Sequence, residues 1–182
     1  MTYAEAFRRQ ASSDFRGYEF LAAKQGESGF DECQPLQCLQ MATEKIAKAT
    51  YYAVTGERPP RDPGTSHDAA PLLTQQAVRL MIASDDVGLL LGWTDAAAYG
   101  AAVRAFEEFL SEVDRLHPRG DTWLNCEYPW IDAADQWWSP AGYRFGLLER
   151  LDQGDGVPFL DFLRKLISSF DQLPWPQPSA SP

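Results

Sequence analysis

The sequence has few residues suited to metal or disulfide chemistry. Its 182 residues include only two histidines and three cysteines, and the cysteines are odd in number and lack CxxC spacing. Neither a zinc site nor a disulfide framework is therefore predicted. The acidic clusters lack EF-hand spacing, and no GxxxxGK, GxGxxG or GxSxG motif occurs. We therefore expect no cofactor and no metal ion.

Positive charge and long apolar runs are also scarce. The chain has 16 Lys and Arg residues against 26 Asp and Glu, which gives a formal net charge of −10. Bulk nucleic-acid binding is disfavoured, because such affinity comes largely from basic residues that neutralise phosphates. No stretch approaches the ~20 apolar residues of a membrane helix, and the first residues lack the apolar segment of a signal peptide. The expectation is a cytoplasmic protein with no membrane partner.

Apolar residues recur at helical spacing in five segments, and no segment alternates as a strand would. Helices are expected over about 2–24, 32–54, 65–83, 94–116 and 157–170. Ser139 followed by Pro140 is typical of a helix start and predicts a further short helix through Leu147. The predicted fold is an all-α, up-and-down bundle of four long helices plus one or two shorter C-terminal helices. We expect residues 1–172 to form one domain and 173–182 to form a loose proline-rich tail, from which Trp175 can dock back onto that domain.

A long loop of about 117–139 holds four of the six tryptophans. Exposing so much aromatic surface to water would be costly, so two interpretations compete. The rings either pack as a lid over the open end of the bundle or form a binding surface. The acidic residues among them suit a basic or uncharged partner better than single-stranded nucleic acid. The candidate surface residues are Glu127, Tyr128, Trp130, Trp137, Trp138 and Arg144.

The second helical segment carries a recognisable pattern, which consists of Gln40, Ala42, Glu44, Lys45, Lys48 and Ala49. A connector with Gly56 leads from it to His67 and Asp68. Over about residues 3–115 the chain resembles the HEPN family, the higher eukaryote and prokaryote nucleotide-binding helical domains. The resemblance implies an up-and-down helical bundle, often a homodimer, that is either an RNA-cutting toxin or a non-catalytic partner-binding module.

The ribonuclease branch of that family carries an arginine and a histidine, four to six residues apart, late in the fold. The equivalent region here, around NCEYPW, contains no histidine. We therefore expect a non-catalytic protein that acts through protein–protein contacts. Its partner is a second copy or a protein encoded nearby, and the resemblance associates it with bacterial toxin–antitoxin or defence-type systems. Narrow apolar seams on the second and fourth helices offer a route to dimerisation.

Two alternatives stay open. One is a metal-independent endoribonuclease that uses Arg61 and His67, since a cation and an imidazole can stabilise a phosphate transition state and move a proton. That pair lies in the connector before the third helix rather than late in the fold. The other is small-ligand binding at the aromatic loop, in a cavity lined by Trp130 and Trp137.

Overall fold

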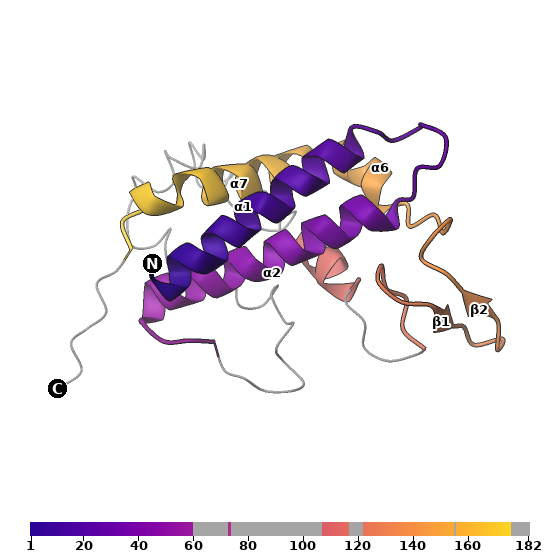
Figure 1. Cartoon of the computed structure of the whole chain (residues 1–182), viewed down its shortest axis with the longest axis horizontal. Helices are drawn as coiled ribbons and strands as arrows, with labels where there is room; N and C mark the ends of the chain where they lie inside the picture. Colours follow the sequence, from indigo (N-terminus) through magenta and orange to yellow (C-terminus); the bar gives the residue numbers. More distant parts are fainter. Residues whose placement is uncertain (60–72, 74–106, 117–121, 155, 176–182) are drawn as a thin grey trace.

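The computed structural model describes residues 1–59, 73, 107–116, 122–154 and 156–175 (Figure 1). Within these ranges the chain is mostly helical, and its β structure is one small two-stranded sheet. The expectation of a helical protein is confirmed in this coarse form. The expected helix over 65–83 and the first part of the one over 94–116 lie outside the described residues, apart from the buried, helical Leu73. No described helix is long and apolar enough to cross a membrane.

Two long helices, α1 (Tyr3–Ala22) and α2 (Cys33–Thr55), form an antiparallel pair (Figure 1). The Thr2 hydroxyl caps α1 by accepting a hydrogen bond from the Glu5 backbone N–H at 3.1 Å. Gly56 ends α2 in the left-handed region, at φ 75°. Both helices lie within two residues of their expected ranges, because the caps and the apolar spacing mark their ends clearly.

Helix α2 lies at the centre of the core. Of the five residues in the apolar seam, Leu39, Ala42, Ile46 and Ala49 are 0% exposed within the single chain, and Ala53 is half-buried. This seam therefore packs inside the molecule and is not free to form a dimer. Residues 107–115 are helical and contribute Phe109, Leu110 and Val113 to the same core.

The C-terminal part consists of α6 (Leu147–Leu151), α7 (Gly156–Ser169) and the 3-10 turn η1 (Phe170–Gln172). Helix α7 packs against α1, where Arg164 pairs with Glu19 at 2.9 Å. The helix expected to begin at Ser139–Pro140 does not form. Gly142 and Gly146 have φ values of 77° and 69°, which an α-helix does not allow, so helix starts only at Leu147.

The chain stays packed beyond the expected domain end at residue 172. Leu173 is buried, and the Trp175 indole N–H donates to the Phe170 carbonyl at 2.7 Å. The Trp175 and Phe170 rings lie 4.4 Å apart. The expected docking of Trp175 is therefore present and extends the folded part to that residue, whereas 176–182 lie outside the described residues.

Candidate functional site

The aromatic segment forms a short hairpin, although the sequence pattern indicated no strand. Strand β1 (Trp130–Ile131) pairs with β2 (Trp137–Trp138), so that Trp130 lies opposite Trp138 and Ile131 lies opposite Trp137. We call residues 130–138 the aromatic ribbon; it lies at the end of the molecule away from the N-terminus (Figure 1). Two-residue strands are too short to show the alternation that identifies a strand in a sequence.

One carboxylate organises the turn of the aromatic ribbon. Asp132 accepts hydrogen bonds from the backbone N–H groups of Ala134 at 2.8 Å and Gln136 at 3.0 Å. Its second oxygen accepts from the Trp138 indole N–H at 2.8 Å. The Trp138 bond, followed by the two backbone bonds, lowers the pKa of Asp132, because all three favour the charged form. Asp135, at φ 58°, completes the turn in a conformation that aspartate tolerates better than most residues.

The inner face of the aromatic ribbon packs on the protein. Trp130 is only 5% exposed and contacts the Tyr143 ring edge-on, with centroids 5.0 Å apart. Trp138 meets the same Tyr143 ring at 5.7 Å, and Tyr143 in turn packs on Phe145 at 5.0 Å. The expectation that rings of this loop would pack on the protein therefore describes Trp130 well, and Trp138 in part.

The outer face of the aromatic ribbon is presented to solvent. Paired residues on two neighbouring strands point to the same face of a sheet, and successive residues along one strand point to alternate faces. The pair Ile131 and Trp137 therefore lies on one face of the aromatic ribbon, and the pair Trp130 and Trp138 lies on the other. Trp137 is 63% exposed, and Tyr128, just before the ribbon, is 61% exposed. The register places the Trp130 and Trp137 rings on opposite faces of the aromatic ribbon, so these two rings do not line one cavity together, and the small-ligand alternative stays a prediction.

Asn125 fixes the chain that enters the aromatic ribbon. Its buried side chain accepts from the backbone N–H groups of Glu127 at 2.9 Å and Tyr128 at 2.7 Å, and donates to the Trp123 carbonyl at 2.9 Å. The Trp123 indole N–H donates to the Arg115 carbonyl at 2.7 Å, at the end of the helix over 107–115. Glu127 and Tyr128 are therefore placed by Asn125, which the sequence analysis did not single out although asparagine commonly forms such turns.

Glu32, the residue before α2, fixes the segment that follows the aromatic ribbon. Glu32 accepts from the backbone N–H groups of Phe145 at 2.9 Å and Gly146 at 3.2 Å, and so satisfies donors at the start of α6. The candidate residue Arg144 is ion-paired with Glu32 at 3.8 Å and with Glu149. These two ion pairs tie Arg144 to the segment before α2 and to α6.

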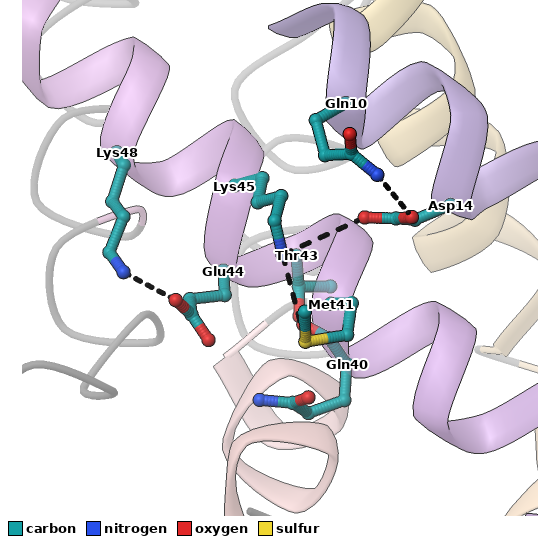
Figure 2. A network of polar contacts seen from close by, with 8 residues as sticks. All are labelled: Gln10, Asp14, Gln40, Met41, Thr43, Glu44, Lys45 and Lys48. Carbon is teal, nitrogen blue, oxygen red and sulfur yellow. Dashed lines mark hydrogen bonds and ion pairs between the residues drawn. The ribbon is translucent and has the colours of Figure 1, made fainter. Parts of the chain in front are cut away.

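The residues that carry the family resemblance have structural roles here. Figure 2 shows Lys45 of α2 reaching Asp14 of α1, with 3.7 Å between Nζ and Oδ2. Gln10 donates to the same carboxylate at 2.9 Å, and Lys48 pairs with Glu44 along α2. These contacts join α1 to α2 and stabilise α2 itself.

A separate open groove of about 460 Å³ lies at the N-terminal end of α1, away from the aromatic ribbon. Its lining is largely apolar and includes Trp175. Its two carboxylates are already paired, Glu5 with Arg9 at 2.6 Å and Asp171 with Arg8 at 3.3 Å. The groove therefore offers a ligand no uncompensated charge.

No protein-family model, curated protein or solved structure matches this chain. Arg61 and His67 lie outside the described residues, so the endoribonuclease alternative stays a prediction. Among the described residues, no group of three histidine, cysteine or acidic side chains is placed to hold a metal ion. The aromatic ribbon is thus the best-defined candidate site, with exposed rings on a base that is fixed from both sides.

Proposed function

We propose that this chain is a HEPN-like helical protein that acts through protein–protein contacts, and that Trp137 and Tyr128 carry the contact. The observation behind the proposal is the division of the aromatic ribbon into two faces. Trp130 is buried as an anchor, whereas Trp137 is 63% exposed on the other side. Large exposed aromatic side chains in a cluster are typical of interaction sites, where tryptophan and tyrosine are enriched among the residues that dominate binding.

The fixed base supports this function. Asp132 closes the turn, Asn125 fixes the incoming chain and Glu32 fixes the outgoing chain. A backbone segment that is already held in place loses little conformational entropy when a partner binds, so more of the contact energy appears as affinity. A loop with the same rings but without these bonds would bind more weakly.

The resemblance to the HEPN family extends the proposal to fold and context. The antiparallel pair α1 and α2, with the motif residues Ala42 and Ala49 fully buried between helices, agrees with an up-and-down bundle of four long helices. The partner would then be a protein encoded nearby, in a bacterial toxin–antitoxin or defence-type system. A homodimer would have to use a surface other than the α2 seam.

Site-specific photocrosslinking tests the proposal. A benzophenone amino acid replaces Trp137 in one variant and Phe20 in a control, because Phe20 is a similarly exposed aromatic residue on α1, at 66%. In cells of the host, position 137 should give a discrete adduct with another protein and position 20 should not. Adducts of equal pattern from both positions, or none from 137, would contradict the proposal.

A further inference from the structure

The described sequence in and around the aromatic ribbon carries more acidic than basic residues. Between residues 122 and 146 the charged residues are three acidic ones, Glu127, Asp132 and Asp135, and one basic one, Arg144. Arg144 is paired with two further carboxylates of neighbouring segments. Acidic residues therefore outnumber basic ones among the described residues of this segment, on a chain whose net charge is −10.

Elsewhere the molecule uses an aromatic ring and a carboxylate together to hold a cation. The Arg150 guanidinium lies 5.2 Å from the Phe109 ring centre and pairs with Glu112 at 2.7 Å. Arg164 lies 5.8 Å from the Phe15 ring centre and pairs with Glu19 at 2.9 Å. Both combine cation–π attraction with an ion pair.

The aromatic ribbon has two parts of this arrangement without the third. Trp137 offers an exposed indole, the best ring for cation–π contact, and the exposed Asp135 is at the adjoining turn. In the described part of the chain, no lysine or arginine lies over the Trp137 ring. A cationic side chain of a binding partner could supply the third component.

We infer that the partner contacts the aromatic ribbon through a lysine- or arginine-rich segment, with one cationic side chain over Trp137 and others facing the surrounding carboxylates. The inference rests on the proposed function and specifies its partner by charge. The negative field of the chain would speed the encounter with such a segment and make the association sensitive to salt.

The same charges disfavour two other occupants. A second copy that docked ribbon to ribbon would bring an identical set of carboxylates, and like charges placed together at an interface weaken binding. A membrane surface rich in anionic lipids would repel the same carboxylates. A basic protein segment meets neither obstacle.

The indole N–H signals of the six tryptophans, assigned by single Trp→Phe variants, provide the test. ¹⁵N-labelled protein is titrated with a lysine–arginine peptide that contains no aromatic residue, and with a peptide in which glutamine replaces every basic residue. The basic peptide should shift the Trp137 signal and leave the buried Trp130 signal in place. Trp137→Ala should weaken binding about tenfold, which corresponds to about 1.4 kcal/mol of cation–π and contact energy. Asp135→Asn should weaken it less, and Phe20→Ala should have no effect.

Other outcomes would overturn the inference. Equal shifts with the glutamine peptide, a uniform shift of all indole signals, or binding that Trp137→Ala does not weaken would show that no cation is recognised there. A Trp137 shift with neutral phosphatidylcholine vesicles and not with the basic peptide would assign the surface to lipid. If position 137 crosslinks a protein in cells but the basic peptide fails, the charge of the partner is wrong and the protein-binding surface stands. If both experiments fail, the surface itself is wrong.

Discussion

Replacing Trp130 and Trp137 by alanine, one at a time, should have very different effects on stability. A tryptophan side chain presents up to about 250 Å² of surface, at about 25 cal/mol per Å² removed from water. Trp130 is 5% exposed and Trp137 is 63% exposed. After the area that alanine itself would bury is subtracted, Trp130→Ala should lower the free energy of unfolding by about 4 kcal/mol. Trp137→Ala should lower it by about 1.5 kcal/mol or less.

Urea unfolding followed by far-UV circular dichroism measures both values against the wild-type protein. The pair is a matched control, since the same residue type is removed from opposite faces of one ribbon seven positions apart. A Trp130→Phe variant should recover part of the loss, because a smaller ring still packs against Tyr143. Equal losses for the two alanine variants, or a larger loss for Trp137→Ala, would refute the division into an anchored and a presented face.

Three further predictions follow from the same segment. Asn125→Ala leaves two backbone N–H groups and one carbonyl without their partner and should cost about 2–3 kcal/mol of unfolding free energy in the same urea assay. The pKa of Asp132 is lowered, so its stabilising bonds are complete above about pH 3.9, the ordinary pKa of aspartate, and are lost as pH falls through the lower folded-state pKa. The NMR signal of the Trp138 indole N–H should therefore titrate with a midpoint below about 3.9. A midpoint above that value would contradict the geometry. Burial, with a smaller effect of Glu127, raises the pKa of Cys126 to about 12, so iodoacetamide at pH 8 should modify this thiol at least about a hundredfold more slowly in the folded protein than in urea, as mass spectrometry can measure.

The helices could be predicted from the sequence because their signals are local. Thr2 and Gly56 mark the start of α1 and the end of α2, and apolar spacing gave the stretches between. The false helix start at Ser139–Pro140 shows the limit of such signals. A serine followed by proline suits a helix, but the glycines at 142 and 146 adopt left-handed conformations that postpone it to Leu147.

The candidate site was only partly predictable for a different reason. The sequence indicated that the tryptophans either pack or bind, but the choice for each ring depends on the register of two short strands. Asp132 supports that register through bonds to the backbone and to Trp138, which involve residues two to six positions away. The bonds from Glu32 to Phe145 and Gly146 span more than a hundred residues of sequence, and spacing alone cannot reveal them.

The central claim is that Trp137 faces a protein partner while Trp130 holds the ribbon to the molecule. Incorporating 5-fluorotryptophan and recording ¹⁹F spectra in cells of the host tests it most directly, because each of the six tryptophans gives its own signal. The account predicts that the Trp137 signal shifts in cells relative to purified protein and returns to its free position when the cells are lysed into high salt, whereas the Trp130 signal keeps its position throughout. A Trp137 signal that is the same in cells and in dilute buffer would contradict the claim.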